Sequence, residues 1–136
     1  MRPSARVLDS YSLITYLEGA DGTDKMIEIF QVARDSGKYL LLSVVNWGEV
    51  YYITLREAGR ERVEAVVHLI STLPIEIVPV DLELAKQAAE FKSHKKMSYA
   101  DCFAAALSKL RRAELITGDE EFKQVEEEIK ILWIGK

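Results

Sequence analysis

Short apolar segments alternate with longer helical stretches along the chain, and this alternation constrains the fold more than any other feature. The run Leu40-Leu41-Leu42 is apolar without alternation, which is typical of a strand covered on both faces. Strands separated by helices form βαβ units, in which the strands are parallel and helices cover both faces of the sheet. The sequence therefore predicts the α/β class, with a single domain over residues 1–136.

The individual elements follow from apolar spacing and from turn residues. The predicted strands are 6–8, 39–42, 75–80, 114–117 and 129–134. The predicted helices are 10–18, 23–36, a segment that contains Glu49 and runs to about 57, then 60–73, 81–92, 99–111 and 120–127. Because Pro79 has no N–H to donate to a neighbouring strand, the third strand is expected at a sheet edge.

Acidic residues follow or face the carboxyl ends of several predicted strands. Asp9 comes directly after the first strand, and Asp119 follows the fourth strand after one glycine. Glu49 lies in the first turns of the helix after the second strand, and Asp101 opens the helix that leads into the fourth strand. Open parallel sheets bind ligands beside the carboxyl ends of their strands, so we expect these four carboxylates to converge there.

Each of these acids also has a purely structural interpretation. Asp9 is a favourable N-cap for the first predicted helix. Ser98 and Asp101 match the S-x-x-D capping pattern. Asp119 suits a turn or a cap, and Glu49 suits a solvated helix face. For each acid taken alone, the sequence leaves both interpretations open.

Taken together, four converging carboxylates favour a divalent cation. Two carboxylates about 5 Å apart repel by roughly 3 kcal/mol at an effective dielectric constant of about 20, so such a cluster needs protons or a cation. The chain has 2 histidines and one cysteine, Cys102, which is a poor supply of zinc or iron ligands. All-oxygen ligation favours one or two Mg²⁺ or Mn²⁺ ions, which can activate water and hold a phosphate for in-line attack.

Four sequence blocks resemble the signature blocks of the PIN domain family, in the family's order and at its spacing. They are LDSYSLI at 8–14, SVVNWGEV at 43–50, SYADCFA at 98–104 and TGDEEF at 117–122. The resemblance covers nearly the whole chain, and among PIN domains the chain looks most like the small VapC-type toxins of bacteria and archaea.

The resemblance implies a three-layer fold with a five-stranded parallel sheet of order 3-2-1-4-5, and a metal-dependent endoribonuclease that leaves 5′-phosphate and 3′-hydroxyl ends. It assigns catalysis and metal binding to Asp9, Glu49, Asp101 and Asp119. The family's small polar positions around these acids match Ser10, Asn46, Ser98 and Thr117. The resemblance also implies a homodimer or higher homo-oligomer, and an antitoxin that lies across the acidic cleft. Glu120 stands where many relatives have proline, and we expect it to add negative charge near the site.

Four residues that are or can be cationic gather immediately before the Ser98 block. They are Lys92, His94, Lys95 and Lys96. We interpret them as a candidate RNA-docking patch, because cations bind backbone phosphates. The structural alternative is a solvated helix end, whose negative pole favours cations. The net charge of −4 argues against a basic stripe over the whole surface but is compatible with a local patch.

Three other functions are alternatives to the nuclease. A haloacid-dehalogenase phosphatase needs a second Asp two residues after its nucleophile, where this chain has Tyr11. A receiver domain needs a phosphoacceptor Asp after its third strand, and Asp81 matches that position poorly. A PIN-like module that binds RNA or protein without cleaving it stays open as the alternative.

The sequence shows neither a signal-peptide pattern nor an apolar run of roughly 20 residues that could span a bilayer. We therefore expect a cytoplasmic protein without a membrane-spanning segment.

Overall fold

The computed structural model describes residues 5–135 and contains one sheet of five parallel strands. The strands are β1 (Arg6–Leu8), β2 (Leu40–Ser43), β3 (Ile75–Val78), β4 (Glu114–Thr117) and β5 (Ile131–Trp133). Their order is β3-β2-β1-β4-β5, and every neighbouring pair is parallel. The predicted α/β class and the predicted strand order are both confirmed.

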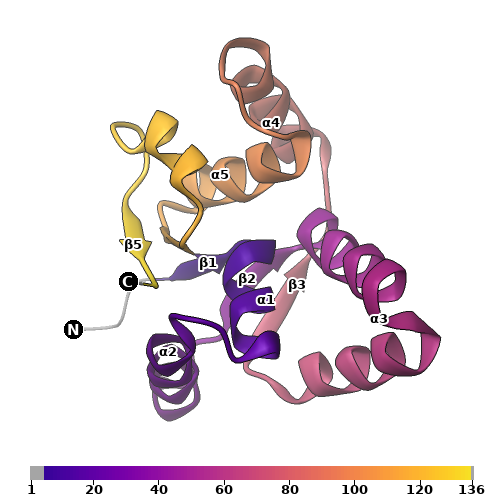
Figure 1. Ribbon diagram of the computed structural model, residues 1–136. Coiled ribbons are helices and arrows are strands. Elements are labelled where there is room, and N and C mark those ends of the chain that lie inside the picture. Colours follow the sequence, from indigo (N-terminus) through magenta and orange to yellow (C-terminus); the bar gives the residue numbers. More distant parts are fainter. Residues whose placement is uncertain (1–4, 136) are drawn as a thin grey trace.

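Helices cover both faces of the sheet and complete the three layers (Figure 1). On one face lie α1 (Ser10–Glu18), α2 (Thr23–Ser36) and α3 (Val44–Thr72). On the other lie α4 (Leu82–His94), α5 (Tyr99–Arg111) and the short 3₁₀ helix η1 (Glu120–Val125). None of the helices in residues 5–135 is long and apolar enough to cross a membrane.

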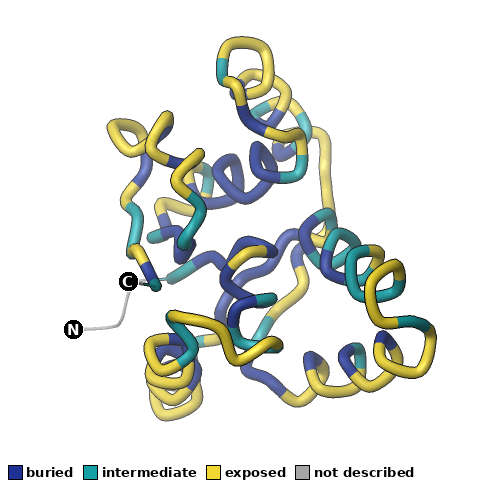
Figure 2. Tube along the Cα trace, viewed as in Figure 1, coloured by how far each residue is buried: buried dark blue, intermediate teal, exposed yellow. Residues whose placement is uncertain are grey.

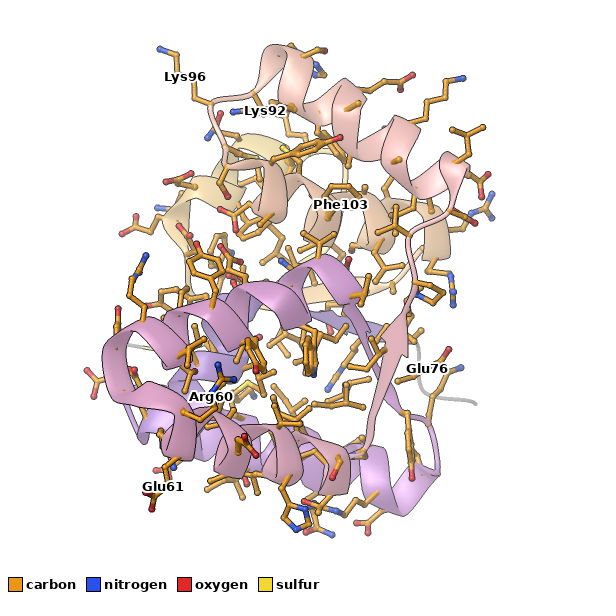
Figure 3. The ribbon with its side chains drawn as sticks, turned by 90° about the vertical axis from the view of Figure 1, so that its right-hand side faces the viewer. Arg60, Glu61, Glu76, Lys92, Lys96 and Phe103 are labelled. Carbon is orange, nitrogen blue, oxygen red and sulfur yellow. The ribbon has the colours of Figure 1, made fainter. Side chains whose placement is uncertain are left out.

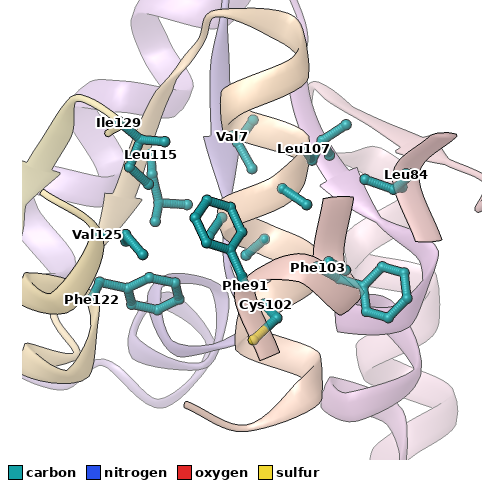
Figure 4. Close-up of a cluster of buried hydrophobic side chains, with 14 of the residues drawn as sticks. Val7, Leu84, Phe91, Cys102, Phe103, Leu107, Leu115, Phe122, Val125 and Ile129 are labelled. Atoms are coloured by element: carbon teal, nitrogen blue, oxygen red, sulfur yellow. The ribbon is translucent and has the colours of Figure 1, made fainter. Parts of the chain in front are cut away.

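Two hydrophobic cores explain why the central strands β1, β2 and β4 lack a polar face. Val7 packs into the core beneath α4 and α5, and its neighbour Leu8 packs into the core beneath α1, α2 and α3. Leu115 and Ile116 of β4 divide in the same way. Figure 4 shows the first core, in which Cys102 is one of the packed side chains. Buried residues accordingly follow the sheet and the inner helix faces, and exposed ones follow the outer turns (Figure 2).

Several predicted boundaries shift. The third strand is an edge strand, as Pro79 indicated, but it ends at Val78, so the proline lies just beyond the ladder. The predicted last strand, 129–134, is shortened to Ile131–Trp133. The predicted helix 120–127 is a 3₁₀ helix of six residues.

The long helix α3 bends at Gly59. This position matches the break between the two helices predicted from the sequence. Gly59 has φ 88° and ψ 177°, a conformation open almost exclusively to glycine. Figure 3 shows the helix turning where Arg60 and Glu61 begin its second part. The bend lets the first part of α3 pack beside α1 and the second part return to the start of β3.

Two glycine-to-alanine variants test this bend. An added Cβ meets nothing within 4 Å at Gly59 or at Gly48, so the two substitutions differ only in backbone conformation. Gly59→Ala is expected to lower the free energy of unfolding by about 1–3 kcal/mol, because alanine resists this φ and ψ. Gly48→Ala, inside the regular helix, is expected to raise it by roughly 0.5–1 kcal/mol. Urea unfolding of both variants measures the difference, and equal effects would contradict a glycine-specific bend.

Candidate active site

A pocket of about 420 Å³ opens where the strands end and the next helices begin. Three of the four predicted acids, Glu49, Asp101 and Asp119, line it. Asp9, the fourth, is fully buried and does not line the pocket. The Thr117 hydroxyl nevertheless bonds to both the Asp9 carboxylate and the backbone of Asp119, which places Asp9 beside the pocket. The structure thus brings all four carboxylates to one end of the sheet.

Asp9 is held by hydrogen bonds from two elements. As the N-cap of α1, it accepts a hydrogen bond at Oδ1 from the backbone N–H of Ser12 at 2.8 Å. Its Oδ2 accepts a hydrogen bond from the Thr117 hydroxyl at 2.5 Å. Burial outweighs these bonds and raises the pKa of Asp9 to about 6. The capping role is therefore real, and it fixes the carboxylate beside the other acids.

Asp101 lies in the first turn of α5 and is only 8% exposed. Ser98 caps that turn, since its hydroxyl accepts the backbone N–H of Asp101 at 3.1 Å. Burial, followed by the negative charges of Asp119, Asp9 and Glu49, raises the pKa of Asp101 to about 7. The site therefore disfavours ionisation of all its carboxylates at once, as expected where buried carboxylates lie close together.

Thr117 and Ser10 connect the acids to one another. The Thr117 hydroxyl donates to Asp9 and accepts the backbone N–H of Asp119 at 3.0 Å, so one side chain orders two acids. The Ser10 hydroxyl donates to Glu49 Oε1 at 2.5 Å and joins α1 to α3. Glu49 is therefore tied to a neighbouring helix, whereas the structural interpretation had it solvated.

Asn46 links the two helices that carry Glu49 and Asp101. Its side chain is fully buried, and Nδ2 donates to the carbonyl of Ala100 at 3.1 Å. Its Oδ1 has no hydrogen-bond partner among the described residues. The bond sets the spacing between the start of α3 and the start of α5, on which the acidic pocket depends.

The sequence analysis missed several residues that line the pocket, among them Tyr11, Glu18 and Glu121. The backbone N–H of Glu121 bonds to Asp119 Oδ1 at 2.9 Å, and its charge raises the pKa of Asp101. Glu120, expected to add charge near the site, is not part of the lining and forms an ion pair with Lys123 at 2.9 Å. The tight 3₁₀ turn after Asp119 turns the second glutamate toward the pocket, which a helix pattern alone does not reveal.

The donor set suits a hard divalent cation, because every acidic group at the pocket offers carboxylate oxygens. The mutual destabilisation of the charged forms, seen in the raised pKa of Asp101, is what a cation would relieve. Within residues 5–135, however, no group of three or more His, Cys, Asp or Glu side chains is already arranged to bind a metal ion. The chemistry of the donors fits a cation, and the side chains would have to close around it.

The four candidate RNA-docking residues lie at the connection between α4 and α5, outside the lining of the acidic pocket. Lys92 Nζ donates to the carbonyl of Met97 at 2.8 Å, and Lys95 pairs with Glu128 at 3.5 Å. His94 and Lys96 are exposed, and Figure 3 shows Lys96 extending from the end of this connection. Two of the four cations thus brace the loop that precedes Ser98.

The fold is shared with solved toxin–antitoxin structures. DNA-bound VapBC from Salmonella typhimurium superposes with a TM-score of 0.76 at 18% identity, covering 96% of this chain and 98% of that one. VapC20 of Mycobacterium tuberculosis, described as a sarcin–ricin loop cleaving toxin, gives 0.70 at 14% identity, with 89% and 95% covered. VapBC-5 of the same organism gives 0.65 at 21% identity, with 98% and 100% covered. No curated protein sequence matches this chain.

The sequence itself matches the PIN domain family over residues 6–128, a span that runs from the first strand to beyond η1 and includes all four acids. With nearly the whole fold inside that match, the chain belongs to the PIN domain family.

Proposed function

We propose that this protein is a metal-dependent endoribonuclease and the toxin of a VapBC-type toxin–antitoxin pair. The observation that carries the proposal is the convergence of Asp9, Glu49, Asp101 and Asp119 at one end of a PIN-domain sheet. The structural likeness to VapC20, a toxin described as cleaving the sarcin–ricin loop, supports RNA as the substrate class. The likeness to VapBC complexes supports an antitoxin as the partner.

Asp101, Asp119, Glu49 and Asp9 are the residues that would hold one or two Mg²⁺ or Mn²⁺ ions. Bound there, such an ion supplies activation of water and neutralisation of charge on the scissile phosphate. Thr117 keeps Asp9 oriented, and Ser10 holds Glu49 at the pocket wall. Asp101, with its pKa near 7, can hold a proton at neutral pH until a cation replaces it. Ser98 and Asn46 fix the start of α5, so the carboxylate of Asp101 is presented at a constant position.

A module that binds RNA or protein without cleaving it is the second candidate, favoured by the lack of a ready ligand group among the described residues. The two functions separate in one experiment. A cellular RNA pool is incubated with the protein in Mn²⁺ or Mg²⁺ and, in parallel, in EDTA. Cleavage that requires the metal supports the nuclease. RNA binding without metal binding and without cleavage supports the module.

Asp101→Asn should separate activity from stability. Loss of a metal-binding carboxylate is expected to abolish RNA cleavage. At the same time, the metal-free variant should be more stable than the wild type at pH 8 by on the order of 1 kcal/mol or more, because a charge disfavoured by its surroundings is removed. Cleavage assays and urea unfolding in EDTA measure the two effects. Glu28→Gln, in the exposed middle of α2, is the matched control and should change neither.

The stability of the metal-free protein should fall as pH rises from about 4 to about 7. Folding raises the pKa of Asp9 to about 6 and of Asp101 to about 7, so in this range the folded state binds more protons than the unfolded state. The favourable contribution is complete below the unfolded pKa of 3.8 and is lost as pH passes the folded values. Thermal unfolding across this range in EDTA tests the sign. Mn²⁺ should cancel the loss near pH 7, and a rise in stability with pH in EDTA would contradict the assignment.

The candidate docking patch is tested by salt dependence. Replacing Lys95 and Lys96 together by Ala should weaken RNA binding in EDTA, where cleavage is absent. It should also reduce the slope of log K against log salt by about 1 for each phosphate that the variant no longer neutralises. The double variant Lys25→Ala with Lys86→Ala, which also removes two exposed cations, is the charge-matched control. A slope equal to that of the wild type would remove these residues from the RNA interface.

A further inference from the structure

A second pocket, of about 510 Å³, lies at the opposite end of the sheet from the acids. Its walls come from residues at or just before the amino ends of β1, β2, β4 and β5, and from the last turns of α2 and α5. Figure 1 shows α2 and β5 on the same side of the molecule. The volume is in the range of small-molecule binding sites. None of its lining residues lines the acidic pocket.

The lining of this pocket is cationic in a chain whose net charge is −4. Five cationic side chains and two acidic ones line it, an excess of three positive charges. The cations are Arg6, Lys38, Lys109, Arg112 and Lys130, and the acids are Glu114 and Glu128. Walls that carry one sign of charge around a concave site concentrate the field and attract ligands of the opposite sign.

Ion pairs account for only part of this charge. Arg6 pairs with Glu114 at 3.2 Å, and Lys109 pairs with Glu128 at 3.2 Å. The other three cations, Lys38, Arg112 and Lys130, form no ion pair with any residue in the described range 5–135. The pocket therefore holds three positive charges that the described part of the protein does not neutralise.

Arg112 sits where the backbone favours glycine. It caps α5 in the left-handed region, with φ 51° and ψ 46°, and is the only non-glycine residue with positive φ among those described. Glycine is the usual residue at such a helix end, since it adopts this conformation without steric cost. An arginine held there at a conformational cost points to a use for its side chain.

The polarity of the helices explains the position of only some of these cations. The carboxyl ends of helices attract positive charge, and Lys109 lies in the last turn of α5. Lys38 directly follows Gly37, the C-cap of α2, whereas Lys130 lies in the segment that leads into β5, away from any helix carboxyl end. Helix polarity alone does not place Lys130 here or bring two helix ends to one pocket, and this gathering of cations favours an anionic occupant.

The uncharged part of the lining suits a flat ring. Ile29, Val32 and Ala33 of α2 form an apolar wall, and Tyr39 is 54% exposed at its edge. Aromatic side chains stack on nucleobases with little sequence preference. A phosphate with more than one negative charge matches three unpaired cations better than a single carboxylate does.

We propose that this pocket binds a nucleoside phosphate, supplied either as a free nucleotide or by a strand of RNA. Arg112, Lys38 and Lys130 bind the phosphate groups, and Tyr39 stacks on the base. The site is separate from the acidic pocket and does not depend on the nuclease function proposed above.

Calorimetric titration of the full chain with ADP in EDTA tests the proposal, because the chelator prevents a metal from carrying the nucleotide to the acidic pocket. Arg112→Gly is expected to weaken binding by about tenfold or more, as for loss of a charge-assisted hydrogen bond. Its thermal midpoint should stay the same or rise, since glycine suits the backbone there. The double variant Lys38→Ala with Lys130→Ala should weaken binding at least as much, and Lys86→Ala should leave it unchanged.

Pyrophosphate and RNA complete the test. Tyr39→Ala should weaken ADP binding and leave pyrophosphate binding unchanged. A short single-stranded RNA with a 5′-phosphate, titrated in the same buffer, identifies the source. If the RNA binds more tightly than ADP and this binding depends on Arg112, the natural ligand is a strand of RNA. If ADP binds as tightly as the RNA, the natural ligand is a free nucleotide. No ADP or RNA binding at millimolar concentration, or equal losses in Arg112→Gly and Lys86→Ala, would overturn the proposal.

Discussion

Two-sided burial of the parallel sheet is the constraint on which the rest of this structure depends. The central strands send alternate side chains into two separate hydrophobic cores, so Val7 and Leu8, adjacent in sequence, lie on opposite faces. The strand interiors therefore have no room for polar chemistry, and polar groups can gather only at the two ends of the sheet. The acidic pocket occupies one end and the cationic pocket the other.

Gathering acids at one end carries an electrostatic cost that the fold reduces only in part. Three helices begin there, capped by Asp9, Ser43 and Ser98, and their amino ends favour negative charge. The pKa of Asp101 nevertheless reaches about 7, so the helix ends and hydrogen bonds do not compensate for burial and for the neighbouring carboxylates. The uncompensated part is what a divalent cation, in the proposed function, would neutralise.

The features of the candidate site that follow from sheet topology could be predicted from the sequence. Parallel strands bring their carboxyl ends to one edge, so the meeting of Asp9, Asp101 and Asp119 follows from their positions relative to the strands. The bend in α3 was also visible, because Gly59 interrupts an otherwise helical pattern. For Asp9, capping and site formation looked like alternatives, and the structure shows the capping bond beside the other acids.

What the sequence did not predict depends on local geometry and on distant contacts. Glu121, and not Glu120, lines the acidic pocket, because the turn after Asp119 is a 3₁₀ helix with a different rotation per residue. The pairing of Lys95 with Glu128 joins segments far apart in the chain, so the charge of Lys95 is partly committed to the fold. The sequence pattern did not predict the cationic pocket either, because its five cations come from segments that are far apart in the chain.

Helix α5 connects the two charged ends of the sheet, since Asp101 lies in its first turn and Arg112 caps its last. Its 13 residues span about 20 Å at the usual helical rise. This separation exceeds the screening length of roughly 8 Å at physiological salt, so an anion bound at Arg112 should affect Asp101 little through space. Any influence of Arg112 on Asp101 must therefore pass through a shift of α5 or of β1 and β4, the strands that also run between the two pockets. Asn46 would resist a shift of α5, because its side chain bonds to the carbonyl of Ala100 in the first turn of this helix and fixes it to α3.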